Sequence, residues 1–179
     1  MSVPEAKLSE TENGLVPEGE GWFVVNARDA VWEESDVMGS GTGFESPDHR
    51  FADYGINVIV LEPGQPNCMY HGEVDQEGFL VLAGECLLLV EGEERPLRQW
   101  DFVHCPSWTE HVFVGAGDGP CAVLMIGGRR GKGVRYPVVD VALRHKAGVE
   151  TETESAREAY APFPDWRYRP YRDGDLPDS

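Results

Sequence analysis

The sequence predicts an all-β fold, a barrel or sandwich of short antiparallel strands. The first observation is a series of seven short apolar runs, at residues 56–61, 67–73, 78–82, 86–90, 102–105, 112–114 and 121–126. The second is that glycine, proline or acidic residues separate these runs, as is typical of turns between strands. The third is the segment 91–94, Glu-Gly-Glu-Glu, whose glycine suits the positive φ angle of a tight hairpin turn.

The N-terminal third of the chain is less regular. Residues 1–20 are acidic and rich in turn-forming residues, so we expect a flexible acidic arm. Residues 21–26 predict a first strand, and residues 30–33 are a candidate second strand. The glycine-dense segment 39–47 favours a mobile loop, such as a rim or lid. The strand-rich domain is therefore expected to span residues 21–136.

The remaining residues, 137–179, are expected to form a C-terminal extension. The basic, glycine-rich segment 127–133 before it is interpreted as a solvated loop. Residues 137–145 suit a strand or a short helix, and residues 153–160 predict a helix capped by Thr151 or Thr153. The tail from residue 161 is rich in Pro, Arg, Trp and Tyr, which predicts an extended segment anchored by its aromatic rings on this barrel or on a partner.

Composition limits the classes of partner. The chain of 179 residues is the size of one domain. Its 32 acidic and 15 basic residues give a formal charge of −17, which disfavours nucleic acid and anionic membranes as partners. Because the sequence shows neither a membrane-spanning apolar run nor a secretory signal, we expect a cytoplasmic protein. The four cysteines have no spacing typical of zinc or disulfide frameworks and are expected to be small core residues.

Two stretches, residues 63–84 and 100–115, contain the candidate metal ligands. The first contains His71, Glu73 and Glu77, and strand alternation would place His71 and Glu73 on one face. The second contains His111 after a proline-broken turn. A single histidine on a strand is more often a hydrogen-bonded packing residue than a ligand. The joint spacing of the four residues favours a metal site instead.

These stretches resemble the paired motifs of the cupin superfamily. In the first motif, His71, Glu73, Glu77 and Gly84 match the last four spacings, with Glu73 at the position where the family usually has a second His. In the second, Pro106 and His111 match, Trp108 replaces a Gly, and residues 100–101 stand where Gly-Asp is common. The resemblance covers roughly residues 56–126.

The resemblance implies a double-stranded β-helix, also called a jelly roll, with a short C-terminal helix and extended tails. It also implies one divalent transition metal, Fe, Mn, Ni, Co or Zn, held by His71, Glu77, His111 and, in one interpretation, Glu73. In the other interpretation Glu73 stays unbound and is the catalytic base. Cupins often pair through N-terminal edge strands, so a homodimer is expected, with residues 22–26 as a candidate edge.

The resulting hypothesis is a metal-binding protein of unknown substrate, a metal-dependent enzyme of oxygenase or isomerase type acting on a small polar organic molecule. The alternative is a non-catalytic small-molecule-binding or regulatory module. Without metal, mutual repulsion of Glu73 and Glu77 would raise the pKa of one of them into the range useful for proton transfer. The expected apolar walls of the pocket are Phe79, Val81, Phe102, Val112 and Phe113.

Overall fold

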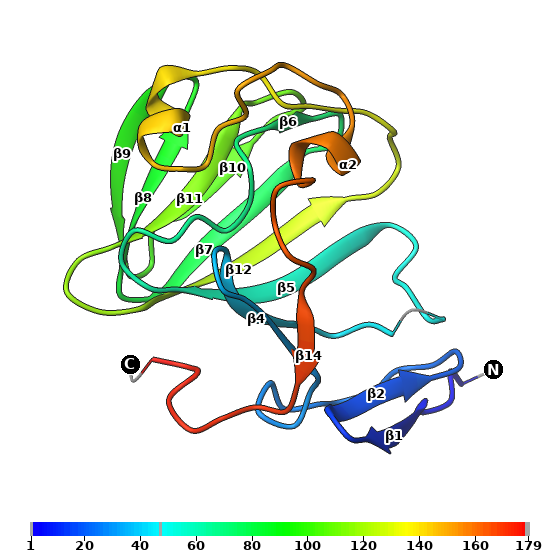
Figure 1. Ribbon diagram of the computed structural model, residues 1–179. Coiled ribbons are helices and arrows are strands. Elements are labelled where there is room, and N and C mark those ends of the chain that lie inside the picture. The colour runs from blue at the N-terminus through cyan, green and yellow to red at the C-terminus, as the bar shows by residue number, and fades with distance from the viewer. Residues whose placement is uncertain (1, 47, 178–179) are drawn as a thin grey trace.

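Two antiparallel sheets face each other in the structure, a computed structural model that describes residues 2–46 and 48–177. The larger sheet has the order β10-β7-β12-β5-β4-β3-β14. Its strands are β3 (Trp32–Ser35), β4 (Gly39–Gly43), β5 (Tyr54–Leu61), β7 (Glu77–Ala83), β10 (Phe102–Cys105), β12 (Cys121–Gly128) and β14 (Arg167–Arg169). The smaller sheet contains β11 (His111–Ala116), β8 (Glu85–Val90) and β9 (Glu93–Arg98) in that order. The predicted all-β fold is confirmed (Figure 1).

Two short sheets and two short helices complete the fold. Strand β6 (Gly72–Glu73) pairs with β13 (Val134–Arg135), and β1 (Lys7–Thr11) forms a hairpin with β2 (Gly14–Glu18). The helices are α1 (Asp140–Arg144) and α2 (Ala156–Ala159). Ser155, and neither Thr151 nor Thr153, caps α2, because its side chain accepts a hydrogen bond from the backbone N–H of Glu158.

The core lies between the two main sheets. Strand alternation turns Phe79, Val81 and Val123 of the larger sheet toward Phe113 of the smaller one, and all four are buried. The rings of Phe79 and Phe113 are tilted against each other with centroids 4.7 Å apart. Cys86, Cys105 and Cys121 are buried and Cys68 is half-buried, all as free thiols, which confirms their predicted packing role.

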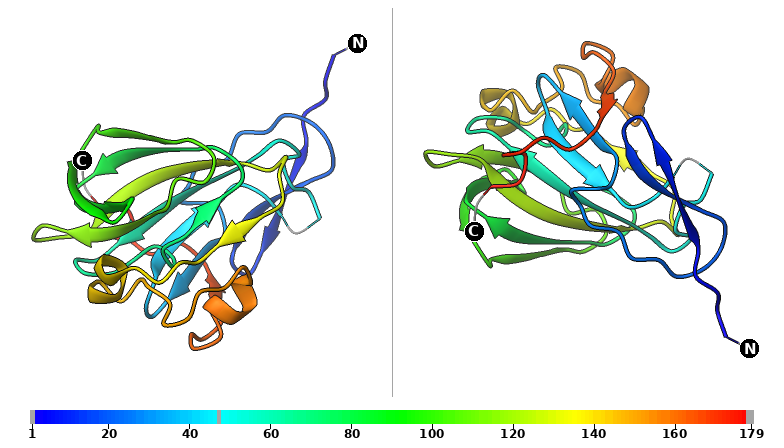
Figure 2. Two further views of the ribbon diagram at one scale, coloured as in Figure 1. Left: turned by 90° about the horizontal axis from the view of Figure 1, so that it is seen from above. Right: turned by 90° about the horizontal axis from the view of Figure 1, so that it is seen from below.

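The C-terminal extension wraps this chain's own barrel. Val141 and Ala142 of α1 pack on Val112 and Val114 of the smaller sheet, whose side chains point away from the core. Figures 1 and 2 show α1 and α2 on one side of the barrel, and the chain after α2 forms β14, which pairs with β3. The tail that was predicted to lie over a surface therefore covers its own sheet, with the Tyr171 ring 5.6 Å from that of Trp32.

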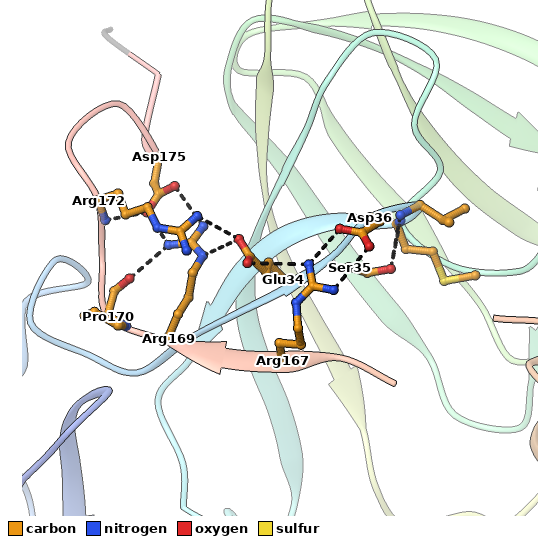
Figure 3. A network of polar contacts seen from close by, with 10 residues as sticks. Glu34, Ser35, Asp36, Arg167, Arg169, Pro170, Arg172 and Asp175 are labelled. Carbon is orange, nitrogen blue, oxygen red and sulfur yellow. Dashed lines mark hydrogen bonds and ion pairs between the residues drawn. The ribbon is translucent and has the colours of Figure 1, made fainter. Parts of the chain in front are cut away.

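Arg169 fixes this tail. Its guanidinium is buried, stacks 5.5 Å from the centre of the Trp32 ring, and donates to Glu34 at 2.7 Å and to Asp175 at 2.6 and 2.8 Å. Figure 3 shows Arg169 held between the two carboxylates, with Arg167 bonded to Asp36 nearby. Because Glu33 and Glu34 alternate on β3, Glu34 enters this network while Glu33 faces the opposite side.

Three expectations about the N-terminal part differ from the structure. Residues 1–20, predicted to be a flexible arm, contain the hairpin β1–β2. Residues 21–26, predicted to be a strand and a candidate edge, form only one isolated bridge, between Glu5 and Trp22. Residues 39–43, predicted to be part of a mobile loop, form β4. Glycine is needed there for close packing, since a Cβ on Gly41 would lie 2.6 Å from the Val58 carbonyl oxygen.

The remaining strand predictions agree with the structure apart from their bounds. The predicted turn joins β8 to β9 with positive φ angles at Glu91 (48°) and Gly92 (78°). The expected strand at 67–73 has regular pairing only at β6, with isolated bridges from Pro66 and His71 to β11. None of the helices among the described residues is long and apolar enough to cross a membrane.

Candidate metal centre

Three side chains converge at one end of the barrel, where β7 begins and β12 ends. His71, Glu77 and His111 each offer a ligand atom, and these atoms all lie within 4.8 Å of one another. His71 and His111 lie directly opposite each other in an antiparallel bridge, with ring centroids 5.2 Å apart. Asn67 holds this register, because its backbone N–H donates to the Phe113 carbonyl and its side-chain oxygen accepts from the Phe113 N–H.

Backbone carbonyls fix the tautomer of both histidines. Nδ1 of His71 lies 2.8 Å from the Met69 carbonyl oxygen, and Nδ1 of His111 lies 3.0 Å from that of Thr109. A carbonyl oxygen can only accept, so each Nδ1 carries the proton in the neutral ring. Both Nε2 atoms therefore keep a bare lone pair, the form in which imidazole binds a metal.

Glu77 completes the cluster. Its Oε2 lies 3.3 Å from Nε2 of His111. Burial, followed by the charge of Glu73, raises the pKa of Glu77 to about 8. Burial also lowers the pKa of His111 to about 4 and that of His71 below its usual value. Although His111 and Glu77 are in contact, burial outweighs their attraction and favours the neutral form of each. Nε2 of neutral His111 and an ionised Oε2 of Glu77 would both be hydrogen-bond acceptors. At this distance they need a cation between them, either a proton or a metal ion.

The donor set fits a divalent transition metal. Two imidazoles and a carboxylate suit Fe, Mn, Co, Ni or Zn and do not distinguish them. Ligand atoms that each lie about 2.1 Å from one ion are roughly 3.0–3.4 Å apart in octahedral or tetrahedral geometry. The His111–Glu77 separation of 3.3 Å falls in this range.

Glu73 lies beside this cluster without joining it. The three convergent ligands do not include Glu73 among the residues described, but its side chain lines the same cavity as His71. The predicted alternation of His71 and Glu73 on one face is therefore present in the structure. A Cβ built on Gly127 would lie 3.6 Å from Glu77 and 3.7 Å from Glu73, so the two carboxylates flank this glycine. Burial, followed by the charge of Asp75, raises the pKa of Glu73.

The cluster opens into a cavity of about 790 Å³, which is within the usual size range of small-molecule pockets. Glycines at inward-facing positions leave room for this space and for the Arg129 guanidinium, which a Cβ on Gly55 would approach to 2.7 Å. Gly55 and Gly127 pair across β5 and β12, and Gly43 pairs with Asn57 across β4 and β5. All three glycines line the cavity, and a Cβ on Gly43 would meet nothing closer than 3.9 Å.

The N-terminal segments supply part of the wall. Residues from three N-terminal and C-terminal strands line the cavity together with His71, Glu77 and His111. They are Leu15 and Val16 of β2, Val31 just before β3, Glu33 of β3 and Tyr168 of β14. These segments lie outside both predicted motifs. Their contribution rests on contacts between distant residues, such as the bridge from Leu15 to Ala30, and no local pattern in the sequence indicates it.

The predicted apolar wall is corrected in part. Phe79 lines the cavity, whereas Val81 and Phe113 are packed in the core and Val112 faces α1. Phe102 is 68% exposed on the outer face of β10, because alternation turns the opposite side of this edge strand inward. Asn57 was missed. The sequence could have indicated this residue, because Asn57 is the single polar residue within the apolar run 56–61.

Comparison with known proteins identifies this barrel. Residues 57–127 match the family model described as Cupin domain. The chain contains a cupin domain. The match runs from β5 to β12 and so includes His71, Glu77 and His111, while the N-terminal hairpin and the C-terminal extension lie outside it.

Solved structures show the same cupin fold at low identity. The polyketide cyclase RemF from Streptomyces resistomycificus is 15% identical, with a TM-score of 0.51, over 59% of this chain and 78% of that one. A protein of Acidithiobacillus ferrooxidans assigned as a sugar phosphate isomerase is 26% identical, with a TM-score of 0.47, over 55% of this chain. The match covers 64% of that protein, less than two thirds of its length. The comparison with curated proteins gives no match.

Proposed function

We propose that this cupin is a metal-dependent enzyme, of oxygenase or isomerase type, that acts on a small polar organic molecule. One observation carries the proposal. Two histidines with bare Nε2 atoms and one carboxylate converge within 4.8 Å in the wall of a cavity of about 790 Å³. A metal site that only stabilises the fold would need no cavity beside it. A pocket that only binds a small molecule would need no convergent set of metal-ligating side chains.

A divalent metal held by His71, Glu77 and His111 would supply Lewis acidity and, with iron, the capacity to use oxygen. The carbonyls of Met69 and Thr109 would keep both rings in the binding orientation. Two histidines and one carboxylate that leave coordination positions open are typical of non-haem iron oxygenases. The position of Glu73 outside the cluster supports this arrangement.

Glu73 supports the isomerase alternative. It lines the cavity beside Glu77, is half-buried, and has a pKa raised by burial and by the charge of Asp75. A carboxylate with a raised pKa is a stronger base toward a bound C–H or O–H group. In that reaction Glu73 would take a proton from the ligand and return it at another position.

Metal analysis of the gently purified protein is the first test. We expect near-stoichiometric Fe, Mn, Co, Ni or Zn that disappears in His71→Ala and in His111→Ala, with unchanged circular dichroism. Glu73→Gln is the matched control, because it removes a neighbouring carboxylate and should keep the metal. Protein that remains empty after reconstitution with each of these metals would overturn the proposal.

Turnover separates the enzyme from a binding module. Protein loaded with Fe(II) should consume oxygen in an electrode assay on addition of a substrate from a panel of small polar molecules, or isomerise it as followed by NMR. Gly43→Val provides the control, since its side chain enters open cavity space away from the ligands. This variant should keep its metal and lose turnover. Unchanged recovery of every bound molecule would favour a non-catalytic module.

A further inference from the structure

The cavity wall on β5, two strands from Glu77 in the same sheet, contains a buried hydrogen-bond acceptor with no partner among the described residues. Oδ1 of Asn57 is the one such buried side-chain nitrogen or oxygen atom in the described part of the chain. Asn57 faces inward on β5, between Gly43 of β4 and Met125 of β12. Because Gly43 has no side chain, the cavity extends beside the Asn57 amide, and both residues line it.

An unpartnered buried carbonyl is costly, typically by about 1–3 kcal/mol, and native proteins keep few of them. The neighbours of Asn57 do not relieve this cost. Met125 presents a thioether, which is itself only a weak acceptor, and Asn67 already donates to that sulfur at 3.6 Å. Oδ1 has almost no exposed surface in this conformation, so the amide would turn toward the cavity to accept from a hydroxyl or ammonium group of a ligand.

The charges that line the cavity favour the same kind of ligand. Glu45 and Arg129 also line it, but they neutralise each other through two hydrogen bonds of 2.7 Å. Besides this pair, the carboxyl groups of Glu12, Glu33, Glu73 and Glu77 line the cavity, against the guanidinium of Arg50. With all four of these groups ionised, a divalent cation at the cluster would still leave the lining negative overall.

Acceptors are therefore abundant and donors scarce around this space. Glu33 faces the cavity from β3, and burial alone raises its pKa. A ligand that brings donors or positive charge would compensate for the buried carboxylates, whereas an anion would add to their repulsion. The apolar residues Leu15, Val16 and Phe79 in the same wall would contact its carbon skeleton.

We propose that the cavity binds a neutral or cationic molecule rich in hydrogen-bond donors, a polyol or an amine, and excludes phosphate esters, with Asn57 as the acceptor that positions it. This inference rests on the proposed function, since it names the substrate class of the same site.

Three probes that share one skeleton test the ligand class. D-glucosamine, D-glucose and D-glucose 6-phosphate carry a positive, zero and negative charge at neutral pH and can be titrated calorimetrically into protein loaded with redox-inert Zn²⁺. We expect glucosamine to bind at least tenfold more tightly than glucose 6-phosphate, about 1.4 kcal/mol, with glucose between them. Tightest binding of the phosphate, or no binding of any probe, would overturn the proposal.

Two variants of one residue test the role of Asn57. Asn57→Leu keeps the size and removes the acceptor, and should weaken glucosamine binding about tenfold with unchanged Zn²⁺ stoichiometry and thermal stability that does not fall. Asn57→Asp keeps an acceptor and should bind glucosamine at least as tightly as the wild-type protein. Unchanged affinity in Asn57→Leu would show that Asn57 does not position the ligand.

The outcomes distinguish this inference from the proposed function. Protein that binds Zn²⁺ through His71 and His111 but prefers glucose 6-phosphate would refute the ligand class and leave the metal-dependent enzyme intact. Protein that never retains a metal would refute the proposed function, whichever probe it binds.

Discussion

The two ends of the barrel differ although the same three strands run through both. Toward one end, β5, β7 and β12 turn Ile59, Val81 and Val123 inward, and all three are buried in the apolar core. Toward the other end, the same strands present glycines and Glu77 at the equivalent inward positions.

This difference shows how one set of strands serves two purposes. Large apolar side chains fill the closed end and provide the burial that stabilises the fold. Glycines at the open end have no side chains to pack, and a cavity of about 790 Å³ lies beside the ligand cluster. Stability and chemistry should therefore respond to substitutions at opposite ends.

The largest expected effect is at the open end. His111→Ala removes one of three convergent ligands, and we expect the affinity for Zn²⁺ to fall by at least about 100-fold in a chelator competition assay. The free energy of unfolding of the metal-free protein should not decrease by a comparable amount. Retained affinity would show that His111 is a packing residue.

The complementary change is at the closed end. Leu61 is fully buried in the core, so Leu61→Ala should lower the free energy of unfolding by about 2–5 kcal/mol in urea titrations. The Zn²⁺ affinity of the folded variant should stay within about threefold of the wild-type value. If metal affinity fell together with stability, the two ends would not be independent.

The effect of pH sharpens the contrast further. The pKa of Glu77 is raised to about 8 by burial and by Glu73, so below that pH a metal must displace a proton from this carboxylate. The histidines release none near neutral pH, because burial lowers the pKa of His111 to about 4 and also lowers that of His71. Apparent Zn²⁺ affinity should therefore rise about tenfold per unit between pH 6 and 8 and level off above.

Calorimetry in buffers of different ionisation enthalpy would count the protons released. About one proton per Zn²⁺ is expected near neutral pH for the wild-type protein and none in Glu77→Gln, which cannot carry that proton. An affinity that is flat from pH 6 to 8 would contradict a protonated Glu77 in the metal-free site.

The smallest effect is expected from a histidine on the outside of the barrel. His104 lies on β10 and is exposed, with its side chain on the outer face beside Phe102. His104→Ala should change the free energy of unfolding by no more than about 0.5 kcal/mol and leave Zn²⁺ stoichiometry unchanged. A loss of metal in this variant would place the site outside the cavity.

The ligand cluster could be predicted from the sequence because its residues lie in two local motifs. The spacing of His71, Glu77 and His111 reflects strand alternation and a turn of fixed length, and the structure brings these three together. Glu73 could not be assigned in the same way. Alternation places it on the correct face but does not determine whether its carboxylate reaches the ligands.

The rest of the cavity was not predictable, for a physical reason. Its wall includes β2, β3 and β4, which are short or glycine-rich, and their position beside the cavity depends on pairing with other segments, such as β4 with β5 and Leu15 with Ala30. Gly41 illustrates this. Local sequence patterns predict a flexible segment there, whereas in the structure a Cβ at Gly41 would lie only 2.6 Å from the Val58 carbonyl oxygen of β5.

The Arg169 network has a consequence for how the protein is made. Arg169 contacts Glu34 across 135 positions of sequence, and β14 covers the outer edge of β3, the strand that contributes Glu33 to the cavity wall. Ribosomes add about 5–20 residues per second, so a nascent chain would wait on the order of ten seconds between making β3 and making its partner. Until then β3 would be an unprotected edge strand, and the cavity wall would lack Tyr168 of β14.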